Sequence, residues 1–473
     1  IVAWIVHTKL AVLPISGDGR PLSEARIVAH VPEETTSLVV RPSGAADGGS
    51  LIAWSAVRDR GESLTVLGVG RDGTARGAPA DIQRTRDHIE WMDLLPTAHG
   101  IVCAWAEETS SGDADILTLA LDTAGKARGA VARVARGVDR WQAIRAGDGV
   151  GLALVTVAPL ADRAARAGSL SWLWLDADGT PQGRPLPIAP TPTVGGDVDV
   201  VPVTGGWLFA WTDRTGEDAR VMLATVSASG RVQGPVAALD ALGGSVLVGL
   251  ASGPRGVAIA WEEPRGRAHA MHALHLAKVS FAPTLAAQPA PSLEIASNIA
   301  PEFVAIDSGF ALLASSRACG TDAAQRGCGG AAPTYTRLSP GLDPVQAEPI
   351  VLPGAKGGTA RTALGWGLRC SKDSCIALAA TGDAPARIFT VNLPARISPF
   401  ALPVLPPLPA EAPRVTGIQT IASGKPFDDL AAVRVGDATL VATMARGLAD
   451  DAPSDRPSRR QQGATIVLRV LGD

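Results

Sequence analysis

The chain has very little tyrosine, methionine and lysine, and it has no long hydrophobic run. It contains 473 residues with 1 Tyr, 4 Met and 5 Cys. No apolar run reaches the roughly 18–20 residues of a membrane-spanning helix, so no transmembrane segment is predicted. The net charge is −3 and no basic face stands out, which argues against nucleic acid as a partner. Neither a phosphate-binding loop nor a Gly-x-Ser-x-Gly motif occurs, and no cofactor is predicted.

Tryptophan is present in excess, with 11 residues, and part of it recurs at a fixed interval. Short apolar runs that end in Ala-Trp return at intervals of about fifty residues, which is typical of a repeat protein. Gly (52) and Pro (36) lie mainly between the apolar runs, as expected for a chain with many turns. The repeated tryptophans, which we interpret as structural packing residues, are Trp4, Trp54, Trp105, Trp211 and Trp261.

The third copy shows the repeat unit most clearly. Its four apolar runs are Ile89 to Leu95, Ile101 to Ala106, Asp115 to Asp122 and Val131 to Val134. Each run is bounded by Gly or polar residues, so we expect four consecutive antiparallel strands, A to D. The C–D turn of successive copies carries a glycine suited to a tight hairpin: Gly19, Gly73, Gly125, Gly179 and Gly230.

Units of this size with four strands predict an all-β fold, a β-propeller of four-stranded antiparallel blades. Our best count is eight blades, with seven or nine left open. We expect one domain over residues 1–473, closed by strands from both termini, with regular blades in 1–280 and degenerate blades with long loops in 281–473. Stacked β-sandwiches would need independent units of about 100 residues joined by linkers, which the sequence lacks.

The repeated pattern also resembles a known class of proteins. An apolar run, Ala-Trp, an acidic residue, Arg and Gly, followed by a strand closing on Asp-x-x-Gly, resembles the repeat of secreted or surface-anchored bacterial β-propeller proteins. The resemblance implies the fold and an exported location. It implies no catalytic residues, because the roles of proteins with this repeat are diverse.

The cysteines favour the same compartment. Cys319 and Cys328 are close in sequence, as are Cys370 and Cys375, and we expect two short-range disulfides in an oxidising environment. The alternative is a metal site with four thiolates, but the spacing is not the usual C-x2-C. Cys103 lies within an apolar run and is predicted to be a buried, inert thiol. The first residues are strand-like and lack Met, so we expect a processed N-terminus.

Acidic and arginine residues follow the repeated Trp in several copies. They could form a ring of carboxylates for acid–base chemistry on a glycosidic bond. Because they recur at equivalent positions, we favour a structural role. A sialidase-like enzyme would need Tyr335 as nucleophile, and that residue falls in a predicted strand. The residues after the repeated Trp are Arg58, Asp59, Arg60, Glu107, Glu108, Asp213, Arg214, Glu262, Glu263 and Arg265.

Two other patterns suggest a metal and are better explained otherwise. His269, His272 and His275 would share one face of a helix, but on the strand expected here His272 points away from the other two. Asp176 and Asp178 lie in a hairpin turn that is too short for a calcium loop. No metal site is therefore predicted.

Loop length varies mainly on the rim that carries the B–C and D–A connections, and we expect ligand or partner binding there. The main hypothesis is a non-catalytic exported scaffold that binds protein partners in a surface or extracellular assembly, and we expect no enzymatic activity. The alternative is a carbohydrate-binding or carbohydrate-active propeller, sialidase-like in type. Exposed aromatics beside carboxylates in a rim pocket would favour it. The variable segments are Pro159 to Gly168, Ser315 to Pro333, Ser398 to Pro413 and Arg446 to Gly463.

Overall fold

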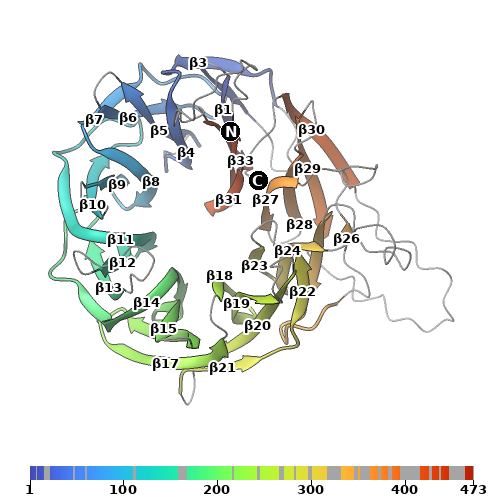
Figure 1. The fold of residues 1–473 in the computed structure, drawn as a ribbon. Helices are drawn as coiled ribbons and strands as arrows, with labels where there is room; N and C mark the ends of the chain where they lie inside the picture. Colours follow the sequence, from blue (N-terminus) through green and yellow to red (C-terminus); the bar gives the residue numbers. More distant parts are fainter. Residues whose placement is uncertain are drawn as a thin grey trace, which may run out of the picture.

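The computed structural model consists of antiparallel β-sheets, and its described part contains no helix. The sheets follow one another in sequence order around a ring, and both termini lie in the same sector (Figure 1). The all-β prediction is therefore confirmed. The structure describes all residues except 7, 15–21, 46–47, 59–60, 110–112, 158–167, 216–217, 242–244, 266–270, 282–283, 297–300, 317–331, 346–349, 352–362, 371–373, 382–385, 395–415, 425–428, 436–437, 447–463 and 472–473.

Three sheets have the expected four strands in simple sequence order. In each sheet, neighbouring strands pair antiparallel, as hairpin-connected strands do. The strands of these sheets are β4 (Thr35–Pro42), β5 (Ser50–Arg58), β6 (Gly61–Val69) and β7 (Ala80–Thr85); β23 (Glu302–Ile306), β24 (Gly309–Ser316), β25 (Ala332–Leu338) and β26 (Ile350–Val351); and β27 (Ala363–Cys370), β28 (Ser374–Thr381), β29 (Ala386–Pro394) and β30 (Thr416–Gly424).

A ten-stranded sheet, made of β8 to β17, joins the three units that follow β7 in the chain. The first part of β11 pairs with β10 and its last part pairs with β12, so one strand serves two units. Gly137 lies at this change of partner with φ of 64°. The strands are β8 (His88–Thr97), β9 (Gly100–Glu108), β10 (Ala114–Leu121), β11 (Ala132–Ala146), β12 (Gly149–Val157), β13 (Gly168–Leu175), β14 (Leu186–Val203), β15 (Gly206–Thr215), β16 (Asp218–Ser227) and β17 (Val232–Ala241).

The two remaining sheets depart from four strands. In a five-stranded sheet, β20 pairs with both β21 and β22. The chain ends meet in a six-stranded sheet, where β1 pairs antiparallel with β33. The strands are β18 (Val246–Gly253), β19 (Gly256–Arg265), β20 (Met271–Ser280), β21 (Ala286–Pro289) and β22 (Leu293–Ala296); and β1 (Val2–Val6), β2 (Lys9–Leu13), β3 (Arg26–His30), β31 (Asp429–Val435), β32 (Ala438–Arg446) and β33 (Ala464–Leu471).

Four of the five repeated tryptophans lie in the core between sheets. Trp54, Trp105, Trp211 and Trp261 are each at most 3% exposed, and Trp4 lies on β1. The unit that lacks this Trp is filled differently, because Trp172 on β13 is fully buried and packs on Phe209 with ring centroids 5.1 Å apart. A cluster of aromatic rings therefore replaces the single Trp in that unit.

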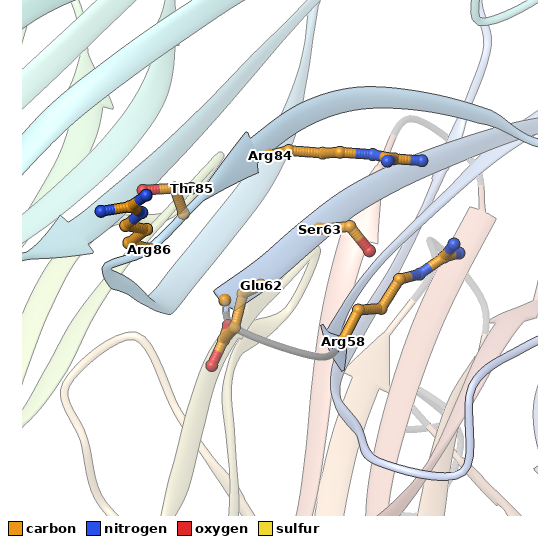
Figure 2. Close-up of a pocket in the computed structure, with 7 residues that line it drawn as sticks. Arg58, Glu62, Ser63, Arg84, Thr85 and Arg86 are labelled. Atoms are coloured by element: carbon orange, nitrogen blue, oxygen red, sulfur yellow. The ribbon is translucent and has the colours of Figure 1, made fainter.

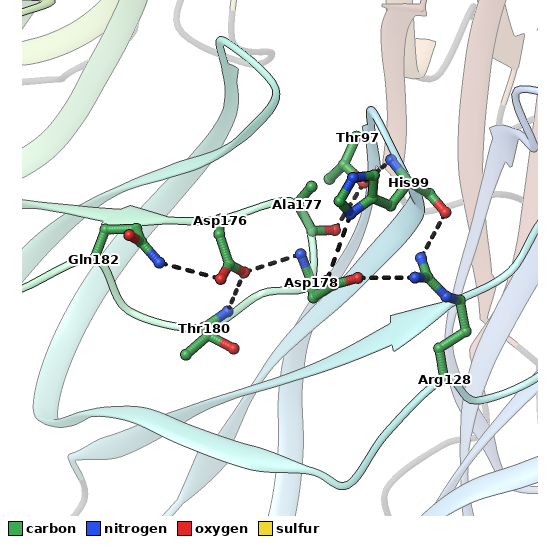
Figure 3. Close-up of polar contacts among 8 residues, drawn as sticks. All are labelled: Thr97, His99, Arg128, Asp176, Ala177, Asp178, Thr180 and Gln182. Carbon is green, nitrogen blue, oxygen red and sulfur yellow. Dashed lines mark hydrogen bonds and ion pairs between the residues drawn. The ribbon is translucent and has the colours of Figure 1, made fainter.

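The turn at Asp176 is a hairpin stabilised by its own side chain. The Oδ1 atom of Asp176 accepts hydrogen bonds from the backbone N–H groups of Asp178 and Thr180, each at 2.9 Å. Asp178 then pairs with Arg128 at 3.2 Å and with His99 at 3.4 Å, both in the preceding unit (Figure 3). The Asp176 carboxylate therefore stabilises its own turn, and the Asp178 carboxylate connects this unit to the preceding one.

Candidate functional site

A pocket opens where the ends of β5 and β7 meet the start of β6. Its volume is about 340 Å³, within the usual range for small-ligand sites of about 300–1,000 Å³. It lies on the rim that carries the connections from β5 to β6 and from β7 to β8, the rim expected to bind ligands. The lining residues, most of them drawn in Figure 2, are Arg58, Gly61, Glu62, Ser63, Arg84, Thr85 and Arg86.

Three arginines give the pocket a positive character. Arg84 forms an ion pair with Asp81 at 2.7 Å, and Arg58 lies 3.7 Å from the other oxygen of the same carboxylate. Arg86 makes no ion pair within the described part of the chain. Burial alone would raise the pKa of Asp81, but the hydrogen bonds from Arg84 and Thr65 lower it below its usual value. Asp81 therefore remains charged and holds two guanidinium groups beside the pocket.

A carboxylate and an imidazole meet at the edge of the pocket. Glu62 is buried, and its Oε1 makes a very short contact with Nδ1 of His88, while its Oε2 accepts from the backbone N–H of Ile89 at 3.0 Å. The hydrogen bond with Glu62 raises the pKa of His88, partial burial opposes it, and the charges of Glu62, Glu90 and Glu108 add to the rise. The pair is suited to holding and transferring a proton.

Stability should depend on the protonation of His88. Because its folded pKa is raised, protonated His88 stabilises the fold fully below the unfolded pKa of about 6.5. That contribution is lost as the pH rises through the folded pKa. We expect His88→Gln to weaken the fall of Tm as the pH rises above about 6.5, measured by thermal denaturation. His99→Gln is the control, and identical pH profiles for wild type and His88→Gln would contradict the assignment.

Glu107 lies behind the pocket, and both of its carboxylate oxygens accept hydrogen bonds from neighbouring side chains. It is 7% exposed and accepts hydrogen bonds from the indole N–H of Trp105 at 3.0 Å, Gln83 at 2.8 Å and Thr85 at 3.1 Å. In the unit of β19, a carboxylate oxygen of Glu263 instead lies 3.0 Å from Nε2 of His275 without hydrogen-bond geometry, and His275 stacks on Trp261. The carboxylates after the repeated Trp therefore do not converge on one site here.

Two further residues of this region stand out, Ser63 in the lining of the pocket and Trp91 outside it. Ser63 is 1% exposed, and its hydroxyl has no hydrogen-bond partner in the described part of the structure. Trp91 is 68% exposed and lies on β8, three residues after His88. An extra residue is accommodated between Ile89 and Trp91, so His88 and Trp91 pair with Glu108 and Ala106 of β9. At a rise of about 3.4 Å per residue, the two residues are about 7 Å apart along the strand.

The other expected site residues have separate locations. The Cys370–Cys375 disulfide is confirmed and joins β27 to β28. Cys103 is buried on β9, and burial raises the pKa of its thiol. Tyr335 is buried on β25, donates a hydrogen bond to Cys375 Sγ at 3.3 Å, and has a raised pKa because it is desolvated.

Several expectations lie outside what the structure describes. Among described residues no group of metal ligands was found, and no helix is long and apolar enough to cross a membrane. His272 is placed on β20, but its side chain is not described, nor are those of Arg214 and Arg265. The following lie wholly or mostly outside the described residues: Cys319, Cys328, Asp59, Arg60, His269 and the segments Pro159 to Gly168, Ser315 to Pro333, Ser398 to Pro413 and Arg446 to Gly463.

Sequence analysis identified Arg58 and Glu107 but missed the rest of the pocket. Its other residues come from the connection between two repeats, Arg84-Thr-Arg-Asp-His88, and from the start of β6. The alternation of basic and polar residues in that connection was the available signal. Whether the residues of this connection form a pocket depends on the strand that lies beside them, and the repeat pattern alone does not identify that strand.

Comparisons with known proteins identify no family for this chain. No protein-family model and no curated protein sequence matches it. Among solved structures, the polysaccharide lyase Uly1 is similar over 100% of this chain and 99% of its own, with 8% identity and a TM-score of 0.42. A prolyl endopeptidase covers 88% of this chain and 55% of its own at 12% identity and TM-score 0.46. The match to a GH43_1 enzyme from Xanthomonas citri, complexed with xylose, covers 53% of this chain and 89% of that enzyme, with 13% identity and a TM-score of 0.27.

These structures correct two expectations from the sequence. The main hypothesis of a non-catalytic scaffold and the expectation of no enzymatic activity are wrong by this comparison, because the similar solved structures are enzymes, among them a polysaccharide lyase and sugar hydrolases. At these identities and TM-scores, the likeness assigns neither a reaction nor a substrate to this chain.

Proposed function

We propose that this chain is an exported β-propeller of eight blades that binds and acts on a carbohydrate at the pocket formed by the ends of β5 and β7 and the start of β6. The fold proposal is supported by the ring of sheets in Figure 1 and by the three sheets with four strands. Export is supported by the disulfide, since such bonds persist in oxidising compartments.

The observation that carries the carbohydrate proposal is the exposed indole of Trp91. A large aromatic residue that is 68% exposed gains nothing from the core, whereas its flat face can pack on the apolar C–H face of a sugar ring. It lies on the same strand as His88, and carboxylate and arginine groups line the adjacent pocket. Exposed aromatics beside carboxylates in a rim pocket are the feature that distinguishes this alternative from a scaffold.

The pocket also contains groups suited to a reaction on a sugar. Glu62 and His88 form the proton-holding pair at its edge, and a carboxylate and an imidazole are among the groups that general acid–base catalysis uses. A sialidase-like mechanism is not supported, because Tyr335 is buried on β25 and hydrogen-bonded to Cys375.

Trp91→Ala should reduce carbohydrate binding without loss of the fold. We expect about a tenfold rise in Kd for the bound polysaccharide, since one stacking contact is removed. The measurement is a screen of polysaccharides by affinity electrophoresis, followed by calorimetric titration of any that bind. Phe281→Ala is the control, because Phe281 is also exposed but follows the far end of β20. If no polysaccharide binds the wild type, or Trp91→Ala binds as tightly, the proposal fails.

A further inference from the structure

We propose that the sugar polymer recognised here is anionic, with carboxylate or sulfate groups bound at the pocket by Arg86 on one side and by Arg58 and Arg84 on the other (Figure 2). This inference rests on the proposed function and adds the chemical class of the ligand. It starts from the charges that line the pocket and asks which ligand group they complement.

The charges in the pocket are unequal. Three guanidinium groups line it, whereas the carboxylates close to them, Asp81 and Glu62, already have partners in Arg84 and His88. Arg86 is exposed, lies in the turn between β7 and β8, and has no ion pair in the described part of the chain. The guanidinium group of Arg86 therefore has no ion-pair partner within the described structure.

Arginine is the side chain best suited to a planar or tetrahedral oxyanion. Its guanidinium group donates two parallel hydrogen bonds to a carboxylate or sulfate, whereas lysine offers only a point charge. Asp81 contacts both Arg58 and Arg84, which restricts how their side chains can turn. A ligand anion would then meet donors that are already oriented, with less loss of conformational entropy on binding.

An unsatisfied hydroxyl lies in the wall of the same pocket. Ser63 is almost fully buried and lines the pocket, and its Oγ atom is closed to solvent and finds no partner among described residues. In Figure 2 its side chain lies between Arg58 and the Arg84 strand. A buried polar group without a hydrogen bond is costly to a fold, so the described protein groups do not fully satisfy this part of the pocket wall.

The site is too local for a nucleic acid or a broad acidic protein surface. The whole chain carries a net charge of −3, and the exposed Asp87 and Glu90 flank the positive groups. A ligand with separate anionic groups along a polymer fits this arrangement better, because one group can enter the pocket while a neighbouring ring reaches Trp91. An acidic polysaccharide has that chemistry.

The test compares charged polymers with matched neutral ones. Polygalacturonate is paired with its methyl ester, and dextran sulfate with dextran, which separates carboxylate from sulfate as the bound group. We expect the charged member of at least one pair to bind more tightly, and more weakly as salt is added. Arg86→Gln should raise the Kd of the charged polymer about tenfold and leave that of the neutral polymer unchanged.

Arg86→Gln is chosen because it breaks no ion pair with a described residue, so the fold should be preserved. Arg71→Gln is the control, since Arg71 is exposed in the turn between β6 and β7, at the opposite ends of the strands. Equal binding of charged and neutral polymers, or no effect of Arg86→Gln, overturns the anionic ligand while the carbohydrate proposal stands through Trp91. If no polymer of any kind binds, the proposed function fails as well.

Discussion

Trp172→Ala is expected to lower the free energy of unfolding by about 3–5 kcal/mol, a typical cost for removing a fully buried aromatic side chain. Trp172 is 0% exposed and contacts Trp174, Trp207 and Phe209 with ring centroids 5.1–5.8 Å apart. Its unit lacks the repeated Trp, so no other indole of that type fills the space. Urea denaturation followed by circular dichroism would measure the change.

A second substitution identifies the space that Trp172 fills. A Cβ atom added at Gly151 would lie 1.9 Å from the Cη2 atom of the Trp172 indole, so Gly151→Ala should destabilise the wild type by about 1–3 kcal/mol. In the Trp172→Ala background the clash is removed, and Gly151→Ala should cost much less. Trp91→Ala, at an exposed site, serves as the control. Additive effects of the two substitutions would refute direct packing between the two residues.

Glu107→Ala is expected to be the second large effect, with a loss of about 2–4 kcal/mol in the free energy of unfolding. The substitution removes the acceptor for three donors, from the fully buried Trp105 and the partly buried Gln83 and Thr85. Each donor would then be left without its partner. Thermal denaturation of the purified variant would give the change in Tm.

Two comparison variants separate the hydrogen bonds from the charge at Glu107. Glu107→Gln keeps one carbonyl oxygen as an acceptor and should lose about half as much stability. Glu90→Ala changes an exposed carboxylate on β8 and should alter stability by less than about 0.5 kcal/mol. If Glu107→Ala were as stable as Glu90→Ala, the buried carboxylate would not support this junction.

The two substitutions also show where sequence reasoning about the repeat succeeds and where it ends. The interval between tryptophans located the units, because one large buried side chain per unit is a strong periodic signal. The same signal could not show that Trp172 fills the unit where the interval is broken. Trp172 lies on a different strand of its unit from the one that carries the repeated Trp, and only packing in three dimensions relates it to Gly151.

Predicted strand positions agree with the structure because local patterns determine them. The runs Ile101 to Ala106 and Asp115 to Asp122 fall within or almost within β9 and β10. The glycine predicted at the tip of the C–D turn has a positive φ at Gly73, Gly125, Gly179 and Gly230. The continuous strands β11 and β14 were not predicted, because a strand that changes partner midway retains the same local pattern on both sides.

The sequence alone determined the all-β architecture, the repeat interval, the turns and the Cys370–Cys375 disulfide, since each depends on residues close together in the chain. Only the tertiary structure decided the site. Glu62 and His88 are separated by 26 positions, and Arg58 and Arg84 meet at Asp81 because three strands end together at one rim. The role of the residues after the repeated Trp was also decided by the tertiary structure, because two of the three donors to Glu107, Gln83 and Thr85, lie on β7 of the preceding unit.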